Sequence, residues 1–489
     1  MLTYTFENIG KESLYEHLYK SIKSDILNQT LKADFKLPSK RNFAKNLGIS
    51  TITVENAYAQ LMAEGYIYSI PKKGYYVSDI SNYPFHKFTD NITDSDNQNL
   101  KQQLSNDYAN DHFKQNKNSR QQNQTSEYIA DFTSNKTNTS KFPFYTWAKL
   151  VKEVIADKSD ELLITSPSEG VYELRLAISR HLKDFRGMNV APEQIIVGAG
   201  TEYLYSLLIQ LLGRDKVFAV EDPGYHKIRQ IYESNNVECI SIPMDNLGIN
   251  PDILNSSKAD IVHLSLSHHY PTGIVTPVSR RYELLKWASD NSDKYIIEDD
   301  YDCEFRLLGK PIPSLQSIDE DEKVIYMNTF TKTLTSTIRI SYMILPTKLL
   351  KKFNERLGFY SCTVSNFEQY TLAKFINDGL FEKHINRMRI FYRNQRDILI
   401  DAINNSPLAK LVDIEEQNSG LHFLLKVNTQ LSDEELIEKA RKNGLKITCL
   451  SEYYYNRQNK ISHKLVINYS SINKQAIDEA IACLYKCLT

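Results

Sequence analysis

The first 80 residues have the hydrophobic spacing of short amphipathic helices. Apolar residues recur every four positions from Leu14 to Ile26, which places them on one face of a helix. Two further helices are predicted over 41–47 and 51–63, with Ser50 as the N-cap of the second. The short turn between them gives the spacing of a helix-turn-helix, and residues 71–77 predict a two-stranded wing.

From about residue 129 short apolar strands alternate with helical segments. This alternation predicts an α/β domain in which helices flank a sheet. After a long helical stretch over 367–404, further strands predict a small α/β lobe at about 405–489. The predicted strands are 194–197, 216–220, 261–266, 294–297, 324–327 and 341–345, and in the lobe 421–427, 446–449 and 464–468.

The segment between these two parts differs in composition. From about residue 86 to 124 it is rich in Asn, Asp, Gln, Ser and Lys and poor in apolar residues. Such a segment cannot bury enough surface to offset the entropy of ordering, so we predict a disordered linker over 81–128. The alternative is a polar helix between domains. The expected domains are therefore 1–80, the linker, and 129–489.

Composition narrows the classes of protein. A chain of 489 residues with 41% hydrophobic residues can form more than one buried core. The net charge of −1 gives the whole molecule no bulk attraction for nucleic acid, so DNA binding requires a local basic patch. The six cysteines have no metal-ligand spacing, and we expect no metal site. With no signal-peptide pattern and no apolar run of about 18 residues, a cytoplasmic protein is expected.

Polar motifs follow several of the predicted strands. Lys332 stands in Thr329-Phe330-Thr331-Lys332, directly after the apolar run 324–327. A lysine amine at such a strand end can form an imine with an aldehyde cofactor. Glu298-Asp299-Asp300-Tyr301 ends the preceding strand, and ligands bind at this edge of open α/β sheets. We interpret the set as a pocket for pyridoxal 5'-phosphate.

Each part of that cofactor has a candidate partner. Gly200, Thr201 and Glu202 open a helix, whose backbone N–H groups can bind phosphate. Asp299 is placed to keep the ring nitrogen protonated. The other predicted contacts are Arg339, Thr329 and Thr331 with the phosphate, Tyr301 with the ring oxygen, and Tyr225 stacked on the ring. A single lysine or acidic run is usually a solvated surface feature, so the order and spacing of the set carry the prediction.

The helix-turn-helix offers candidate DNA contacts. Thr51, Thr53 and Asn56 can face a groove, while Lys72 and Lys73 at the wing tip can contact phosphate. The alternative is a small helical packing domain with solvated lysines.

The N-terminal part resembles the winged helix of GntR-type bacterial repressors. The resemblance runs from Pro38-Ser39-x-Arg41 through the turn to Glu64-Gly65-Tyr66. It implies that Ser39 and Arg41 touch the DNA backbone and that the second helix reads bases. The family usually has an arginine after the turn serine, where this chain has Thr51.

Residues 129–489 resemble fold-type I aminotransferases, and the whole chain resembles the MocR subfamily of GntR regulators. The strand-end motifs carry this resemblance, together with Gly170–Arg175, Arg186-Gly187 and Phe381–Arg389. It implies an effector domain that binds pyridoxal phosphate and a small amine or amino acid. It also implies a homodimer that presents two winged helices to two operator half-sites in double-stranded DNA.

Three positions depart from the enzyme pattern. Tyr270 stands where these aminotransferases have an asparagine that contacts the cofactor, and His269 stands where MocR members have glutamine. Val466 occupies the position of the arginine that binds the substrate carboxylate. Arg457 and Lys464 are candidates to replace it, although a point charge orients a carboxylate less well than a bidentate arginine.

The sequence therefore predicts a transcriptional regulator that senses pyridoxal phosphate, an amine or an amino acid through an imine at Lys332. The alternative function is an active aminotransferase with an accessory DNA-binding domain, which turnover would distinguish. A third interpretation is a cofactor-free interaction protein on a decayed enzyme fold.

Overall fold

The computed structural model of the chain describes residues 4, 13–71, 73–80, 128–134, 137–307, 312–418 and 420–489. Nearly all of the predicted linker, together with Lys72, lies outside the described residues.

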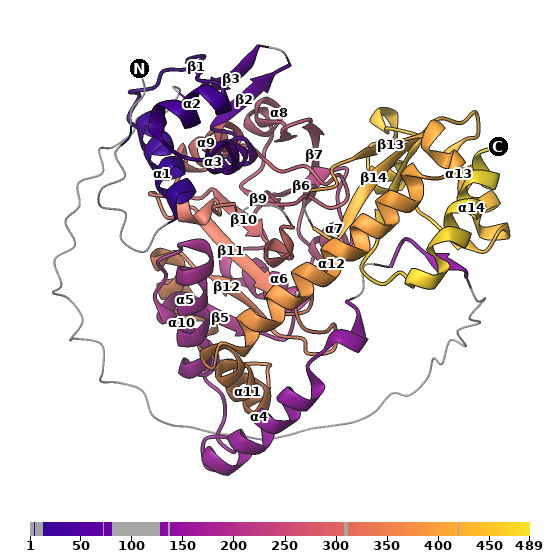
Figure 1. The fold of residues 1–489 in the computed structure, drawn as a ribbon. Helices are drawn as coiled ribbons and strands as arrows, with labels where there is room; N and C mark the ends of the chain where they lie inside the picture. Colours follow the sequence, from indigo (N-terminus) through magenta and orange to yellow (C-terminus); the bar gives the residue numbers. More distant parts are fainter. Residues whose placement is uncertain are drawn as a thin grey trace.

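The N-terminal part is a winged helix (Figure 1). The N-cap Ser50 accepts a hydrogen bond from the Thr53 backbone N–H at 3.0 Å, which starts the second helix of the predicted pair. That helix ends at Gly65, whose φ of 81° is the left-handed conformation that glycine favours. The predicted helix-turn-helix is present, and so is the wing, but its first strand (Ile67–Ile70) lies before the predicted range 71–77. The elements are α1 (Leu14–Leu27), α2 (Lys40–Leu47), α3 (Thr51–Glu64), and the sheet β1 (Lys36–Leu37), β3 (Gly74–Val77) and β2 (Ile67–Ile70).

An eight-stranded sheet organises the second part, in the order β5-β12-β11-β10-β9-β6-β7-β8. Five of these strands run parallel to a neighbour, whereas β12 is antiparallel to both of its neighbours. The six strands predicted for this part are all present, whereas β7 and β8 were not predicted. The bounds are β5 (Ile195–Gly198), β6 (Phe218–Asp222), β7 (Cys239–Asp245), β8 (Gly248–Ile249), β9 (Ile261–Leu264), β10 (Tyr295–Asp299), β11 (Val324–Thr329) and β12 (Ser341–Ile344).

Helices cover both faces of this sheet because successive strand residues point to opposite sides. Ile195 and Val197 pack with α4, α5 and α11, while Ile196 packs with α6, α7 and α10. Ile296 and Val324 pack with α8 and α9. The helices are α4 (Phe144–Asp157), α5 (Tyr172–Arg186), α6 (Thr201–Leu212), α7 (His226–Ser234), α8 (Pro251–Ser256), α9 (Val278–Ser289), α10 (Thr347–Leu357) and α11 (Asn366–Asn377).

A smaller lobe completes the chain. The helical stretch predicted over 367–404 is broken at Gly379, whose φ of 68° ends one helix and precedes α12 (Leu380–Asn404). One core joins the long α12 to the lobe. The other elements are β13 (Val412–Glu415), β14 (His422–Val427), β16 (Lys464–Asn468), α13 (Asp433–Lys442), α14 (Ile477–Leu488), and β15 (Leu445–Lys446) paired with β4 (Ala130–Asp131).

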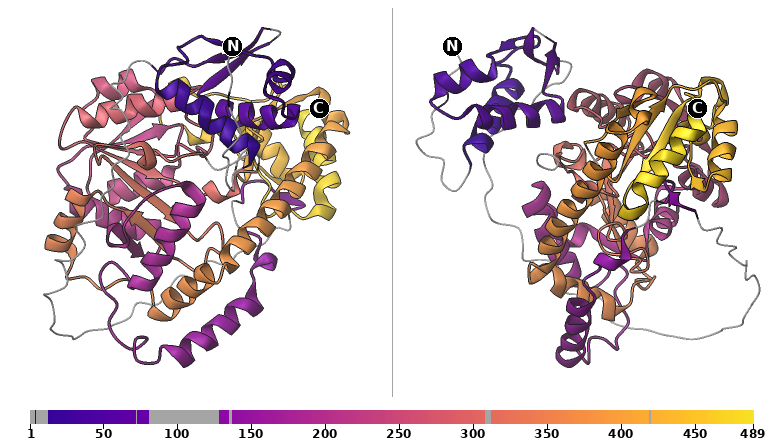
Figure 2. Two further views of the ribbon diagram at one scale, coloured as in Figure 1. Left: turned by 60° about the vertical axis from the view of Figure 1, so that its left-hand side comes forward. Right: turned by 45° about the vertical axis from the view of Figure 1, so that its right-hand side comes forward.

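The winged helix packs against α9 of the second part, outside the sheet (Figure 2). Val278 of α9 belongs to the hydrophobic core of the winged helix, together with residues such as Phe43, Leu61 and Tyr66. The two parts therefore share buried apolar surface. Across the part of the chain that the structure describes, we find no helix with the length and hydropathy of a membrane span.

Candidate functional site

A cavity of about 630 Å³ opens where β6, β9, β10 and β11 end. Parallel strands bring their carboxyl ends to one edge, so motifs that are far apart in sequence meet there. All but one of the predicted cofactor contacts line it, and the remaining residue, Gly200, directly precedes the lining residue Thr201. The predicted residues that line the cavity are Lys332, Tyr225, Asp299, Tyr301, Thr201, Glu202, Thr329, Thr331, Arg339 and His269.

Lys332 lies three residues beyond the end of β11 and lines the cavity. Burial disfavours the charged ammonium and lowers the pKa of Lys332 to about 8, with the Asp302 carboxylate opposing this effect. A larger fraction of the amine is therefore neutral near pH 8 than in an ordinary lysine. A neutral amine is the form that attacks an aldehyde.

Asp299 is the last residue of β10 and is buried. Tyr205 Oη donates a hydrogen bond to Asp299 Oδ2, and His263 Nε2 lies 3.4 Å from the same oxygen. Asp299 Oδ1 is buried and has no hydrogen-bond partner among the described residues. A buried carboxylate oxygen without a donor is costly, so this atom fits the protonated ring nitrogen of the cofactor.

The N-terminus of α6 forms one wall of a cradle for an anion. Gly200 has a φ of 92°, and a Cβ at this position would overlap the guanidinium of Arg339. Arg339 Nη2 lies 3.5 Å from the Ala199 carbonyl oxygen, so the guanidinium is held across the helix start. Across the cradle, Thr331 Oγ1 accepts a hydrogen bond from Thr329 Oγ1 at 2.8 Å. The donors fit a phosphate group.

Glu202 is the one acidic residue of this cradle. Its backbone belongs to the first turn of α6, but its carboxylate bears the same charge as a phosphate. Lys227 bonds to this carboxylate and lowers its pKa, and Arg339 Nη2 lies 3.5 Å from Glu202 Oε2. The carboxylate is thus paired with cations of the cavity wall.

The ring-contact candidates have different surroundings. Tyr301 Oη donates to the His268 carbonyl oxygen at 3.1 Å. Tyr225 is 50% exposed, and its ring meets that of Tyr270 edge to face. His269 Nδ1 lies 2.7 Å from Thr272 Oγ1, and burial lowers the pKa of His269 to about 3, so the ring is neutral.

Two of the positions that depart from the enzyme pattern, Tyr270 and Val466, lie in one aromatic and apolar cluster. Tyr270 Oη and Tyr453 Oη are hydrogen-bonded at 2.7 Å. Val466 is fully buried and packs in a small core with Leu424 and Leu450, next to these two tyrosines. The side chain at this position therefore contacts apolar neighbours instead of presenting a charge.

The structure does not bring Arg457 and Lys464 to the cavity. Arg457 is exposed in a short 3-10 helix, and Lys464 Nζ is hydrogen-bonded to Glu415. The spacing along the chain did not show that both side chains point away from the strand ends. Cations that do line the cavity are Lys227, Arg229, Lys332, Arg339 and Lys446.

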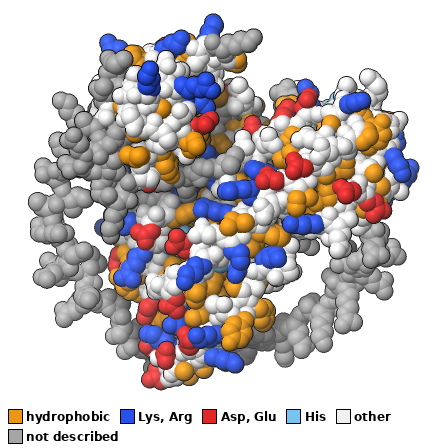
Figure 3. All heavy atoms as spheres, in the orientation of Figure 1, with side chains coloured by type: hydrophobic (Ala, Val, Ile, Leu, Met, Phe, Trp, Pro, Cys, Tyr) orange, Lys and Arg blue, Asp and Glu red, His pale blue; other side chains and the backbone are white. Residues whose placement is uncertain are grey.

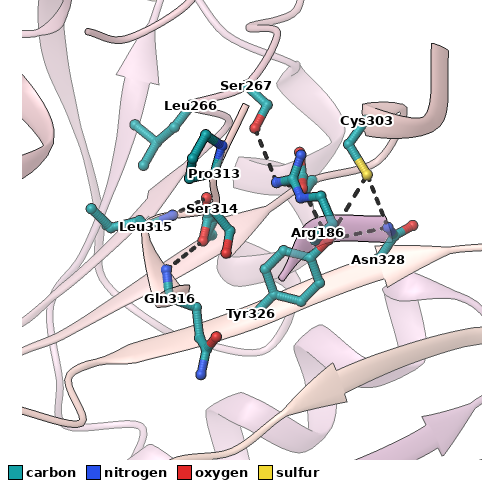
Figure 4. A network of polar contacts seen from close by, with 12 residues as sticks. Arg186, Leu266, Ser267, Cys303, Pro313, Ser314, Leu315, Gln316, Tyr326 and Asn328 are labelled. Carbon is teal, nitrogen blue, oxygen red and sulfur yellow. Dashed lines mark hydrogen bonds and ion pairs between the residues drawn. The ribbon is translucent and has the colours of Figure 1, made fainter. Parts of the chain in front are cut away.

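Buried ion pairs fix the strand ends behind the cavity. Arg186 Nη2 bonds to Asp300 and approaches Ser267 Oγ at 3.5 Å, and Tyr326 Oη donates to Asp300 at 2.9 Å (Figure 4). Asn328 Nδ2 donates to Tyr326 Oη at 3.2 Å. The network joins α5, β11 and the segments that follow β9 and β10.

Glu298, the residue before Asp299 in β10, is fully buried. The backbone N–H groups of Leu315 and Gln316 donate to its two oxygens at 2.7 and 3.0 Å. Arg281 of α9 donates to the carbonyl oxygens of Leu266 and Pro313 at 3.0 and 2.8 Å. Helix α9 is thus attached to the segment that leads into the cavity residues after β9.

The same helix contacts the winged helix. A Cβ added to Gly65 would lie 2.6 Å from Pro277 Cβ, so α3 ends directly against the start of α9. Nearby, the buried Glu64 accepts hydrogen bonds from Tyr19 Oη at 2.8 Å and Lys23 Nζ at 3.1 Å. Helix α9 therefore connects the cavity wall with the winged helix.

The candidate DNA contacts are mostly exposed. Thr51, Asn56, Arg41 and Lys73 are exposed on the winged helix. Ser39 is exposed as well, but its side chain caps α2 by accepting from the Asn42 N–H at 3.3 Å. The hydroxyl of Thr53 lies 2.8 Å from that of Ser50, so it takes part in the cap of α3. Lys and Arg side chains are visible on this part in Figure 3.

Three residues near Lys332 and Asp299 were not predicted from the sequence. Tyr205 and His263 hold Asp299, and Asp302 opposes the effect of burial on Lys332 while accepting from His268 at 2.8 Å. Tyr205 lies four residues after Thr201 on α6, a spacing that places both on one helix face. That spacing was the available signal. His263 stands in an apolar strand and gave none.

Comparison with known proteins agrees with this architecture. Residues 14–77 match the family model described as bacterial regulatory proteins, gntR family. The chain is 38% identical to the uncharacterized HTH-type transcriptional regulator YdeL of Bacillus subtilis, over 96% of this chain and 95% of that protein. It is 28% identical to the probable rhizopine catabolism regulatory protein MocR of Rhizobium meliloti, over 96% and 93%.

The second part has the fold of solved aminotransferases. The multiple substrate aminotransferase of Thermococcus profundus superposes with a TM-score of 0.66 and 24% identity, over 75% of this chain and 92% of that one. A winged helix of the GntR type therefore precedes a domain with the fold-type I aminotransferase architecture. The chain belongs to the MocR subfamily of GntR-type transcriptional regulators.

Proposed function

We propose that this regulator binds pyridoxal phosphate covalently at Lys332 and changes its DNA contacts when an amine or amino acid reaches the cofactor. The observation that carries the proposal is the cavity in which Lys332, with a lowered pKa, lies with Asp299, whose Oδ1 has no partner among the described residues. The anion cradle at the start of α6 fits the phosphate. When bound, the cofactor supplies an aldehyde carbon that reacts reversibly with primary amines.

The residues of the chain have separable parts in this function. Thr201, Thr331 and Arg339 would hold the phosphate, Asp299 the ring nitrogen and Tyr301 the ring oxygen. Tyr205 and His263 hold the Asp299 carboxylate in place through the contacts described above. Among relatives, one is named the pyridoxine biosynthesis transcriptional regulator PdxR of Corynebacterium glutamicum, 33% identical over 59% of this chain and 62% of that protein. Its name supports a regulator linked to this class of cofactor.

The surroundings of Tyr270 and Val466 favour a sensor over an enzyme. Tyr270 stands where these aminotransferases have an asparagine amide that contacts the cofactor. Its hydroxyl is hydrogen-bonded to Tyr453 instead. Val466 lies in an apolar core and offers no charge to a substrate carboxylate. Without an arginine at this position, a substrate carboxylate would be less well oriented for repeated proton transfer. Binding without net turnover is therefore proposed.

The connection through α9 supports coupling between the two parts. Arg281 donates hydrogen bonds to the carbonyl oxygens of Leu266 and Pro313 beside the cavity. Pro277 and Val278 pack against the winged helix at the end of α3. A ligand changes DNA binding only if it has unequal affinity for two arrangements of these parts. Displacement of the segment after β9 would reach α9 through Arg281.

We also propose that two copies pair through the aminotransferase-like domain. Several large apolar side chains are exposed on and after α4: Phe144 at 76%, Tyr145 at 86% and Leu163 at 83%. Figure 3 shows hydrophobic side chains among charged ones at this end of the molecule. Exposed apolar groups of this size are typical of protein interfaces, and a second copy would place two winged helices on one operator.

The test of the cofactor proposal is the visible absorption of the purified protein with added pyridoxal phosphate, followed after addition of a panel of amines and amino acids. We expect an absorption band of the lysine-bound cofactor that shifts with the effector and then remains constant. The Lys332→Ala variant should lack this band and the ligand response. Conversion of the cofactor to its amine form with release of a keto acid would show that the chain is an aminotransferase.

A further inference from the structure

The exposed face of α3 is the surface from which base contacts can come. Neighbouring exposed residues of this face are one, three or four positions apart along α3, so they form one stripe of the helix. The packing of the winged helix against α9 leaves this stripe exposed to solvent. The exposed residues are Thr51, Ile52, Glu55, Asn56 and Ala59.

Ile52 is the large apolar side chain of this stripe, and it is 68% exposed. An isoleucine exposed on a helix that enters the major groove can bury its surface against a base. The apolar group that bases present in that groove is the C5-methyl group of thymine. The side chain of Ile52 therefore matches thymine.

Asn56 lies one turn further along the same face and is exposed. Its amide has one acceptor and two donors, which match N6 and N7 of adenine in a bidentate contact. Because Ile52 and Asn56 are four residues apart on a helix, they can meet base pairs close together in one half-site.

Guanine has no matching residue on α3. Bidentate contact with guanine O6 and N7 comes from arginine or lysine, and the α3 sequence contains neither. Glu55 is the residue of the stripe that could accept from cytosine, but its carboxylate is paired with Lys40 of α2. The Lys40 ammonium offsets the charge of this carboxylate.

We infer that α3 selects A·T base pairs, with Ile52 against the methyl group of thymine and Asn56 on adenine. Exposed cations nearby, such as Arg41, Lys45 and Lys73, supply phosphate contacts that carry no sequence information. The inference rests on the DNA binding of the proposed function and is independent of the cofactor.

The experiment begins with the full-length protein and a pool of random duplex DNA at fixed salt. We expect the enriched half-site to contain A·T pairs at the positions that α3 reaches. Each thymine of that half-site is then replaced by deoxyuridine, which lacks only the methyl group. Loss of one methyl contact should weaken binding about fourfold at one position. In the Ile52→Ala variant the same replacement should have no effect.

Asn56 is tested with 7-deazaadenine, which lacks the N7 acceptor. Asn56→Ala should lower affinity for the selected site about 5- to 150-fold and remove the sensitivity to the modified adenine. The matched control is Lys45→Ala on α2, which should weaken binding to all sequences alike and keep the full effect of deoxyuridine. Thr51→Arg should add a guanine preference in a new selection.

Circular dichroism of each variant checks that the winged helix remains folded, as expected for changes at exposed positions. Enrichment of G·C pairs at the α3 positions would overturn the inference while leaving DNA binding intact. An equal effect of deoxyuridine on the wild type and on Ile52→Ala would overturn the role of Ile52. A pool without any enriched sequence would overturn both this inference and operator binding.

Discussion

Arg281 Nη1 lies 3.8 Å from Glu298 Oε1 in the interior of the domain. Glu298 directly precedes Asp299, the carboxylate that faces the cavity. Burial lowers the pKa of Arg281, and the Glu298 carboxylate opposes that effect. The same guanidinium holds the carbonyls of Leu266 and Pro313. A single side chain of α9 thus fixes the positions of two segments next to the cavity.

Replacing Arg281 by methionine should lower the stability of the effector domain strongly. It leaves a buried carboxylate without its cation and removes the donor from the carbonyls that it holds, at a cost of about 3–5 kcal/mol. The midpoint of urea unfolding measures the loss. Lys286→Met, at an exposed position of the same helix, is the control and should change stability by less than about 0.5 kcal/mol.

The pairing itself is tested by the double variant Arg281→Met with Glu298→Gln. If the two side chains compensate each other, the double variant should be less destabilised than the sum of the two single variants. Additive losses would show that the guanidinium acts through the carbonyl contacts alone.

Gly65→Ala should disturb both the winged helix and its contact with α9. The residue has a φ of 81°, and its new Cβ would lie 2.6 Å from Pro277 Cβ. Gly48→Ala is the matched control, because Gly48 has a φ of 66° but nothing within 4 Å of the added Cβ. Both variants should lose about 1 kcal/mol from the left-handed conformation.

Hydrogen exchange separates the two effects of these glycine variants. Only Gly65→Ala should increase exchange of the amides at the start of α9, because only this variant pushes the helices apart. Equal exchange at α9 in both variants would contradict the close packing of Gly65 on Pro277.

Attachment of pyridoxal phosphate should depend on pH through the ionisation of Lys332. The folded pKa of about 8 lies below that of an ordinary lysine, so the rate of attachment should rise as pH increases through about 8 and level off above it. Stopped-flow absorption between pH 6.5 and 9.5 measures this rate. A simple alkylamine should show the same rise only near pH 10.4.

The same pKa has a consequence for stability. The unfolded chain binds the lysine proton more tightly than the folded chain, so unfolding free energy should rise with pH between the folded and unfolded pKa values of Lys332.

Asp302→Asn removes a carboxylate that raises the pKa of Lys332. The midpoint of attachment should therefore move to lower pH in this variant, and a move to higher pH would contradict the assigned role of Asp302.

Tyr205→Phe should weaken cofactor binding although Tyr205 lies behind Asp299. Its hydroxyl donates to the carboxylate, and hydrogen bonds to charged groups contribute about 1.5–3 kcal/mol, so affinity should fall about tenfold or more. Equilibrium dialysis of pyridoxal phosphate measures the change. Tyr232→Phe is the control one step further away, since Tyr232 contacts His263 Nδ1 at 2.6 Å, and it should have a smaller effect.

Dimer formation is tested at the exposed aromatic residues of α4. Phe144→Lys combined with Tyr145→Lys should shift the sedimentation of the protein from that of a dimer to that of a monomer, because charges replace apolar contact area. The matched control is Lys149→Glu on the same helix, an exposed charged position, which should leave sedimentation unchanged.

The sequence predicted the parts of the fold that depend on local pattern. Strand ends such as Asp299 and the lysine after β11 follow apolar runs, so their meeting at one sheet edge could be inferred from α/β geometry. The partly polar strand β7 has a weaker pattern, with only Cys239 and Ile242 buried along it, and was missed.

Contacts that depend on tertiary packing could not be predicted in this way. Nothing local indicates that His263 turns toward Asp299, or that Val278 completes the core of a domain some 200 positions away in sequence. The direction of Lys464 depends on its partner Glu415 across the lobe. For that reason Lys464 does not reach the cavity, and Arg457 is exposed in a short 3-10 helix instead.

The alternation along β10 limits how this site can evolve. Neighbouring acids at the end of the strand serve different environments: Glu298 binds backbone amides in the interior, and Asp299 faces the cavity. Because side chains alternate with a period of two, inserting or deleting one residue in this strand before Glu298 would turn each carboxylate to the opposite face. A change in the length of this strand would remove both the proposed cofactor contact of Asp299 and the backbone contacts of Glu298. Variation in this strand therefore has to proceed by substitution.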